Sequence, residues 1–139
     1  MIYIGTIRDV SNNYDENWLI VRSAKSIPRF SEQVVDLSPS SSLFYRYLNA
    51  KKAGIWNEQW FADNYVPQFI REIKSNPNAI DLLGKLYHDS FTKDIVLCCY
   101  CPDEKLCHRS IIAGLLLGSG ANISCDLDYI KYWNMFTNS

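Results

Sequence analysis

Residues 96–117, VLCCYCPDEKLCHRSIIAGLLL, constrain the fold more than any other part of the chain. The segment begins with an apolar, β-rich run, passes through a charged loop and ends in a second apolar run. An almost wholly apolar run of this length is typical of a central parallel strand that is covered on both faces. The second run is closed by Gly118 and Gly120, which is typical of a helix end. We therefore predict a strand, a loop and a helix in succession.

Further strands and a long irregular connection are predicted on either side of this unit. The β-rich runs at residues 2–7 and 17–23 indicate two strands, and residues 123–124 indicate a short last one. Within the first run, Gly5 marks a bend or a close approach of another part of the chain. Residues 25–40 contain two prolines and are expected to be irregular.

Three helices are predicted in the middle of the chain. Ser38 as N-cap and Pro39 as the first helical residue indicate a helix to about residue 52, stopped by Gly54. A second helical pattern begins at Asn57 and is expected to kink or restart at Pro67. A third helix follows residue 77, and its buried side is expected to carry three residues: Ile80, Leu83 and Tyr87. Strands that alternate with helices predict a single-domain, three-layer α/β fold over residues 1–139. We expect it to be Rossmann-like, with a small parallel or mixed sheet.

Composition excludes several classes of protein. With 14 basic and 15 acidic residues, the chain lacks the excess of positive charge typical of a protein that coats duplex nucleic acid. The first residues show no secretory signal, and no apolar stretch is long enough to span a bilayer. Three of the five cysteines crowd into residues 98–101, which suits a reducing compartment better than a disulfide framework. We expect a cytoplasmic protein without a membrane partner.

The loop between the strand and the helix carries the strongest candidate site. Ligands of open α/β sheets bind outside the carboxyl ends of the strands, where a helix N-terminus offers unpaired N–H groups and partial positive charge. Arg109 at this position could bind a phosphate or carboxylate through two N–H groups. His108 could act as a donor, an acid or a base, and the same field would lower the pKa of Cys107 and favour its thiolate.

Alternative interpretations of the loop compete with anion binding. Zinc could be held by four residues of the segment: Cys99, Cys101, Cys107 and His108. However, the spacing lacks a Cys-x-x-Cys knuckle, and adjacent cysteine and histidine side chains rarely face one metal. A tyrosine-phosphatase loop needs an arginine six positions after a cysteine, but Arg109 lies eight positions after Cys101. We therefore expect no metal and no other cofactor. Cys98 is interpreted as packing inside a buried strand.

Other residues are weaker candidates for the same ligand site. Arg22 at the end of the second strand could reach the pocket or remain solvated. Cys99 and Cys101 are expected to end the central strand, and Tyr100 between them could stack on a base. Trp56 could form a stacking wall with Trp60, although core packing explains both residues as well.

These residues resemble a known family, the DUF488 proteins of bacteria and phages, which include the YeaO-like proteins. The family shows a cysteine at the end of a strand and then Cys-His-Arg at the start of a helix. The matching residues here are Cys99, Cys107, His108 and Arg109. Three more segments are similar: SPSSSL at residues 38–43, WFADNY at residues 60–65, and an early strand that ends at Arg22. The resemblance implies this fold and this site, and leaves the reaction open.

The chain departs from the family pattern at two places. The family often has a glutamate soon after the strand cysteine, where this chain has Cys101. If that glutamate is catalytic, the resemblance implies that this chain lacks it or replaces it with Glu104. The basic, proline-rich stretch that follows the first arginine in the family is matched only loosely by KSIPRF at residues 25–30.

Three hypotheses about function follow. The first is a protein that binds a phosphorylated nucleotide or a nucleic-acid-derived ligand and cleaves its glycosidic or phosphate linkage, as a hydrolase or transferase. In it, Arg109 and Arg22 hold the anion, Cys107 and His108 are catalytic, and Cys99, Cys101, Tyr100 and Trp56 line the site. The second is a binding protein that sequesters a nucleotide signal or a partner protein without turnover, such as a phage antagonist of host defence. The third is a thiol-redox or zinc protein.

Overall fold

The computed structural model describes residues 1–139 and shows an α/β domain with a five-stranded parallel sheet in the order β3-β2-β4-β1-β5. The strands are β1 (Ile2–Thr6), β2 (Glu16–Leu19), β3 (Ser31–Gln33), β4 (Ile95–Cys99) and β5 (Ile123–Ser124). Every paired strand runs parallel to its neighbour. Strand β4 lies in the middle and all five of its residues are buried, which confirms the predicted central strand.

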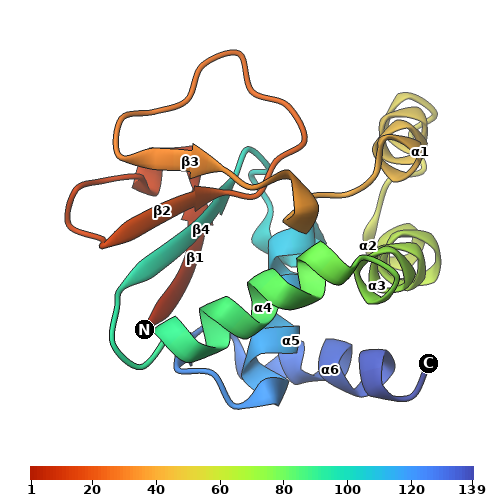
Figure 1. Ribbon diagram of the computed structural model, residues 1–139. Helices are drawn as coiled ribbons and strands as arrows, with labels where there is room; N and C mark the ends of the chain where they lie inside the picture. Colours follow the sequence, from red (N-terminus) through yellow and green to blue (C-terminus); the bar gives the residue numbers. More distant parts are fainter.

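Six helices and five short turns connect the strands (Figure 1). The helices are α1 (Ser41–Lys52), α2 (Glu58–Trp60), α3 (Val66–Lys74), α4 (Pro77–Asp89), α5 (His108–Ser119) and α6 (Ile130–Thr137). The turns are η1 (Ile7–Asp9), η2 (Val35–Leu37), η3 (Phe61–Tyr65), η4 (Glu104–Leu106) and η5 (Leu127–Tyr129). None of the helices is both long and apolar enough to span a bilayer.

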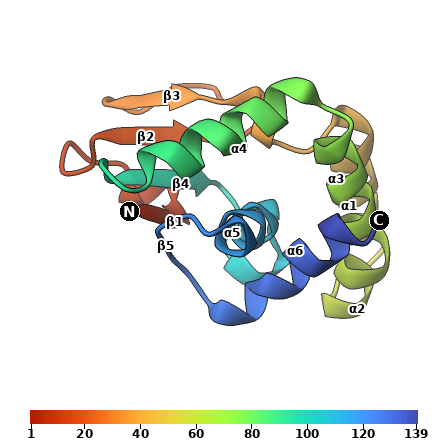
Figure 2. The same cartoon turned by 60° about the horizontal axis from the view of Figure 1, so that its bottom comes forward.

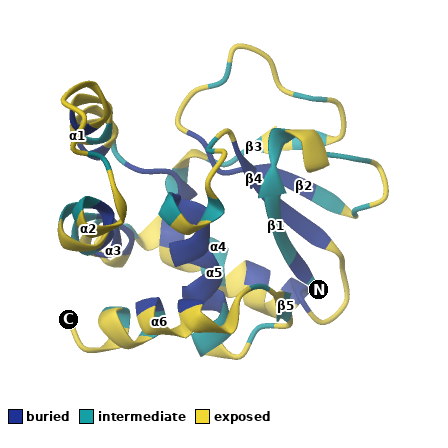
Figure 3. Ribbon diagram, turned by 180° about the vertical axis from the view of Figure 1, so that it is seen from behind, coloured by how far each residue is buried: buried dark blue, intermediate teal, exposed yellow.

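The long helices lie on one face of the sheet and beyond its carboxyl end. Figure 2 shows α4 and α5 beside the sheet, α6 packed on α5, and α1, α2 and α3 past the strand tips. On the opposite face, η1 and the loop after it cover the strands, and Figure 3 shows no long helix there. Tyr3 of β1 packs against Tyr14 of this loop, with ring centroids 5.5 Å apart. The third layer is therefore a turn and a loop.

Gly5 is where this turn meets the sheet most closely. A Cβ atom added at Gly5 would lie 2.5 Å from the Asp9 Oδ2 atom. Asp9 in turn accepts a hydrogen bond of 2.7 Å from the Thr6 backbone N–H. The close approach that the sequence indicated at Gly5 is confirmed.

Helix α5 lies at the centre of the molecule. Nine successive residues, His108 to Leu116, are buried, as expected of a helix surrounded by other elements. One side of α5 contacts the sheet, and other sides contact α3, α4 and α6. Gly120, with a left-handed φ of 93°, ends the helix as predicted, whereas Gly118 lies within its last turn. One continuous cluster of 28 buried residues spans the sheet and the helices, so the chain forms one folding unit.

Several element boundaries differ from the prediction. Ser40, not Ser38, caps α1, because the Ser40 hydroxyl accepts from the Leu43 N–H while Ser38 donates to the Val35 carbonyl. The pattern from Asn57 begins at that residue as predicted, but a π-helical turn, η3, precedes Pro67, which sits in the first turn of α3. Strand β4 ends at Cys99, so Cys101 lies in the loop and not in the strand.

Other differences concern burial and missed elements. The buried side of α4 carries Ala79 and Leu86, whereas the predicted Ile80 and Tyr87 are 40% and 42% exposed. Strand β2 stops at Leu19, so Arg22 lies three residues beyond it. The stretch expected to be irregular contains β3 and η2, and the C-terminal tail contains η5 and α6.

Candidate functional site

Five residues around the start of α5 form a compact group, here called the thiol cluster: Cys99, Cys101, Cys107, His108 and Arg109. Strand β4 delivers Cys99 and the following loop delivers Cys101. Cys107 has extended backbone angles as the N-cap residue of α5, and His108 and Arg109 form the first turn. The sequence prediction that these residues meet at the carboxyl end of the central strand agrees with this geometry.

Arg109 contacts the cysteines from the first turn of α5 and is only 2% exposed. Its Nη1 atom donates to the Cys99 Sγ atom at 2.8 Å and to the Cys101 carbonyl oxygen at 2.8 Å. A buried guanidinium needs an anionic or strongly polar partner. Here the Cys99 sulfur supplies one within the protein. Arg109 is therefore engaged by the thiol cluster instead of being held free for a solvent-borne anion.

The three thiols of the cluster have unlike environments. Hydrogen bonds from the Cys101 and Cys107 thiols, together with the positive charge of Arg109, hold the pKa of Cys99 well below its ordinary value. Burial raises the pKa of Cys107 far above its ordinary value. The pKa of Cys101 is raised as well. Its hydrogen bond with Cys107 lowers the pKa, but its hydrogen bond with Cys99 and its burial raise the pKa by more. Cys99 is therefore the thiolate of the cluster at neutral pH.

This result corrects the sequence prediction for Cys107. We expected the helix terminus to lower the Cys107 pKa, but the residue is 1% exposed and its side chain makes no cap hydrogen bond. Desolvation of the thiolate form outweighs the helix field. Cys98, on the opposite face of β4, is inert packing as predicted, and burial raises its pKa to about 12.

His108 is fixed in one tautomer by its surroundings. Its Nε2 atom lies 2.6 Å from the carbonyl oxygen of Ile20, which can only accept, so Nε2 carries the proton. The Nδ1 atom then offers its lone pair toward the Cys107 Sγ atom, 3.6 Å away. Burial lowers the pKa of His108, so the ring is neutral at pH 7. His108 thus positions Cys107 and holds the loop after β2.

Cys99, Cys107 and His108 also offer three ligand atoms for a metal, all within 4.8 Å of one another. Zinc would require the two sulfur atoms to move apart by about 0.9 Å. Thiolates at the usual Zn–S distance of about 2.3 Å in a tetrahedral complex lie roughly 3.8 Å apart. The Cys99 and Cys107 sulfur atoms are 2.9 Å apart. In addition, the Arg109 guanidinium already neutralises the thiolate that zinc would need.

A cavity of about 580 Å³ opens above the thiol cluster; we call it the aromatic cavity. It lies at the carboxyl end of the sheet, between the loops after β2 and β4 and the inner side of α1. Six aromatic residues line it: Phe44, Tyr45, Tyr47, Trp56, Tyr65 and Tyr100. Cys99, Cys101, Cys107 and His108 line it as well, whereas Arg109 does not.

Apart from the Cys99 thiolate at its floor, the charged groups of the aromatic cavity are basic. Arg22 and Lys51 line it, and no aspartate or glutamate does. The Arg22 Nε atom donates to the Pro39 carbonyl oxygen at 2.7 Å, which directs the guanidinium while leaving its Nη groups available. The Lys51 ammonium donates to the Tyr47 hydroxyl at 3.1 Å. This charge pattern favours an anionic occupant.

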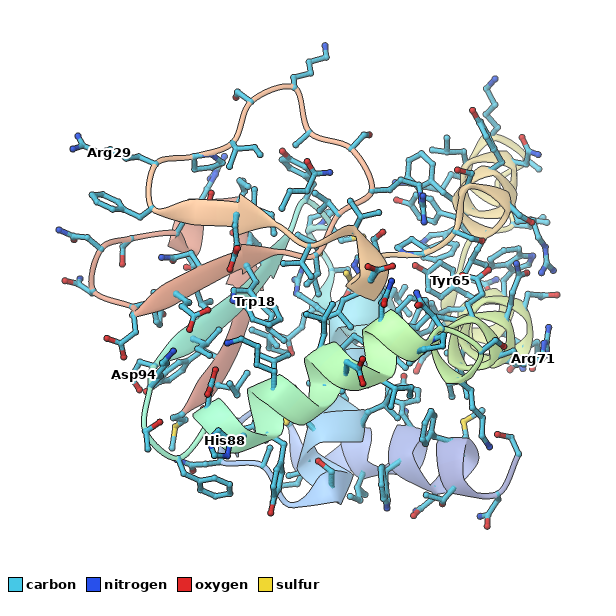
Figure 4. All side chains as sticks on the ribbon, viewed as in Figure 1. Trp18, Arg29, Tyr65, Arg71, His88 and Asp94 are labelled. Carbon is cyan, nitrogen blue, oxygen red and sulfur yellow. The ribbon has the colours of Figure 1, made fainter.

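At the inner end of the aromatic cavity, the aromatic residues pack against one another and against the core. Trp56 packs against Tyr47 with ring centroids 4.6 Å apart and against Tyr65 at 6.0 Å. Tyr65 stacks in turn on Phe69 of the core. Figure 4 shows Tyr65 between α1 and α3, on the side that faces the sheet. Trp56 thus serves both core packing and the cavity wall, the two roles that the sequence left open.

The structure brings most of the sequence-predicted site residues together. Arg22, Tyr100 and Trp56 line the same cavity as the cysteines, and Tyr100 is 50% exposed at its mouth. Glu104 does not line the cavity; it accepts a hydrogen bond of 2.6 Å from the Tyr129 hydroxyl. It therefore gives the site no carboxylate to replace the one often found in the family.

Sequence reasoning missed the five cavity residues of α1: Ser41, Phe44, Tyr45, Tyr47 and Lys51. The helix was predicted, but nothing in its sequence shows that its aromatic face looks across a cavity toward β4. The signal in the sequence is the run of aromatic residues at Phe44, Tyr45 and Tyr47, which is wider than one buried helix face needs.

The family model DUF488-N3a, described as the active DUF488-N3 subclade, matches residues 2–120. The chain belongs to the DUF488 family. The match includes the thiol cluster and every residue of the aromatic cavity, and it stops at the end of α5, before β5 and α6. No curated protein and no solved structure matches the chain.

Proposed function

We propose that this DUF488 protein binds a phosphorylated nucleotide, or a nucleic-acid-derived ligand that carries a phosphate, in the aromatic cavity. One observation carries the proposal: a cavity lined by six aromatic rings and two cations, without a carboxylate, has a thiolate at its floor. Aromatic faces stack on bases of any sequence, and an arginine beside a lysine suits a phosphate. The volume of about 580 Å³ falls in the range of ordinary small-ligand sites.

The roles of the residues change in this proposal. Arg22 and Lys51 hold the phosphate, and Trp56 and Tyr100 stack on the base. Arg109, which does not line the cavity, is the counter-ion that keeps Cys99 ionised. Cys99 is the nucleophile, in place of Cys107 as the sequence suggested.

The proposed reaction is displacement at the phosphate or the glycosidic linkage of the ligand. The Cys99 sulfur forms a bond to phosphorus or to the sugar carbon while the bond to the leaving group breaks. The leaving group takes a proton from water in the cavity. Water then cleaves the thiophosphate or thioglycoside intermediate, which releases a proton and restores the Cys99 thiolate. The description of the matching subclade as active supports turnover.

Ligand-induced thermal stabilisation with a panel of nucleotides tests the binding step. Arg22→Gln should weaken binding about 10- to 100-fold, because a hydrogen bond to a charged group contributes about 1.5–3 kcal/mol. Trp56→Ala should cost a comparable factor through lost stacking. Arg71→Gln, an exposed arginine of α3 outside the cavity, is the matched control and should bind as the wild type does. Equal stabilisation of the Arg22 variant and the control would contradict the proposal.

Recovery of the ligand tests turnover. A free base after incubation indicates glycosidic cleavage, and inorganic phosphate indicates cleavage of the phosphate ester. Cys99→Ser should abolish either product while it retains binding. Recovery of an intact ligand would reject catalysis and favour the second hypothesis, in which the protein sequesters a nucleotide signal. The five free cysteines fit a reducing cytoplasm, where we propose that the protein acts.

A further inference from the structure

The Cys99 and Cys107 sulfur atoms lie close together, although the proposed nucleotide binding does not need this proximity. They are 2.9 Å apart, and both residues are 1% exposed and free. A disulfide has an S–S distance of about 2.05 Å, so the two atoms need to approach by only about 0.9 Å to form a bond. The bond would join the end of β4 to the first residue before α5.

The two thiols are also chemically unequal in the way that peroxide chemistry requires. Arg109 donates to the Cys99 sulfur at 2.8 Å, but it lies 3.7 Å from the Cys107 sulfur. Cys99 is therefore the stronger nucleophile and Cys107 the thiol that keeps its proton. Both residues line the floor of the aromatic cavity, and their exposure of 1% restricts access to a reactant as small as a hydroperoxide.

We propose that Cys99 is a modification site for hydroperoxides and that Cys107 is its resolving thiol. The Cys99 thiolate attacks the peroxide, the O–O bond breaks, and Cys99 becomes a sulfenic acid while the departing oxygen takes a proton and leaves as water or an alcohol. The Cys107 thiol then attacks the Cys99 sulfur and displaces hydroxide. The proton that Cys107 loses combines with that hydroxide, so that a disulfide and a second molecule of water result.

The disulfide would switch off the proposed nucleophile reversibly, and this consequence rests on the proposed function. A cellular dithiol would restore both thiols by exchange at the disulfide. Without Cys107, the sulfenic acid at Cys99 would react with a second peroxide molecule to give a sulfinic acid, which dithiols do not reduce. The pair thus protects Cys99 as well as regulating it.

Tryptic peptide mapping tests the pairing directly, since trypsin cleaves after lysine and arginine. Cleavage after Lys93, Lys105 and Arg109 places Cys99 in residues 94–105 and Cys107 in residues 106–109. After treatment with one equivalent of hydrogen peroxide, the two peptides should be linked, with a mass lower by two hydrogen atoms than their sum. Dithiothreitol should separate them again.

Two variants sharpen the test. Cys101→Ser should still give the linked peptides, whereas Cys107→Ser should lose them and, with a second equivalent of peroxide, accumulate sulfinic acid at Cys99. A disulfide confined to residues 94–105 would assign resolution to Cys101 and overturn the proposal. Irreversible oxidation of wild-type Cys99 at the same rate as in Cys107→Ser would also overturn it. The wild-type map is decisive by itself if a variant does not fold.

This outcome is separable from the proposed function because the mapping uses no nucleotide. Linked peptides in a protein that neither binds nor cleaves nucleotides would uphold the redox pair and reject the nucleotide proposal. Nucleotide cleavage that is insensitive to peroxide, without linked peptides, would do the reverse.

Discussion

His108 is neutral and buried, and this state makes the stability of the fold depend on pH. Its pKa is lowered by burial in the folded protein and returns to an ordinary value of about 6.5 in the unfolded chain. The unfolded state therefore binds a proton more readily, and the free energy of unfolding should fall as the pH drops below about 6.5. Urea denaturation at about pH 7.5 and about pH 5.5 measures this loss.

The second histidine provides a matched control for this prediction. His88 lies on the outer surface of α4, where Figure 4 shows it pointing away from the core. His88→Asn should lose as much stability between the two pH values as the wild type, and His108→Asn should lose less. The Cys99 thiolate, whose pKa is lowered on folding, adds a dependence of the same sign that all three proteins share. An equal loss in all three would contradict the assignment of His108.

At the level of elements, the packing of α6 on α5 depends on two glycines of α5. A Cβ atom at Gly114 would lie 2.2 Å from the Tyr129 carbonyl oxygen, and one at Gly118 would lie 1.9 Å from the Trp133 ring. Gly114→Ala should destabilise the protein by about 1–3 kcal/mol or more, because the backbone of η5 must move. Chemical denaturation checks this value.

Gly84 of α4 supplies the opposite case in the same experiment. It is exposed, and nothing lies within 4 Å of an added Cβ atom. Gly84→Ala should stabilise the protein by about 0.5–1 kcal/mol, because alanine loses less backbone entropy in a helix. If both alanine variants were stabilised, the close contact between α5 and α6 would be wrong.

The elements that sequence patterns missed are those that tertiary contacts create. Strand β3 has only three residues, all polar, and lies at the edge of the sheet, so it carries no apolar alternation. Helix α6 has eight residues, too few to be stable alone, and it forms against α5. The wrong buried face predicted for α4 has the same origin. The periodicity predicted the helix, but packing against α5 and the sheet determines which of its faces is buried.

For the whole molecule, ligand binding should couple α1 to the end of the sheet. The aromatic cavity is bounded by α1 on one side and by the loop after β4 on the other. A nucleotide that bridges them should slow amide hydrogen exchange in residues 41–52 and 100–107. Residues 130–137 of α6, outside the cavity, should exchange at an unchanged rate. Protection confined to the loop would mean that α1 does not contact the ligand.

The central strand, the buried helix after it, and the meeting of Cys99, Cys107, His108 and Arg109 between them were predictable from the sequence alone. These features depend on the local apolar pattern and on short spacings along the chain. Which thiol is ionised depends instead on the folded structure, because pKa values follow from burial and from neighbours such as Arg109. The folded structure also decides that Arg109 pairs with a sulfur atom, and that the aromatic face of α1, some fifty residues earlier in the chain, closes the cavity above it.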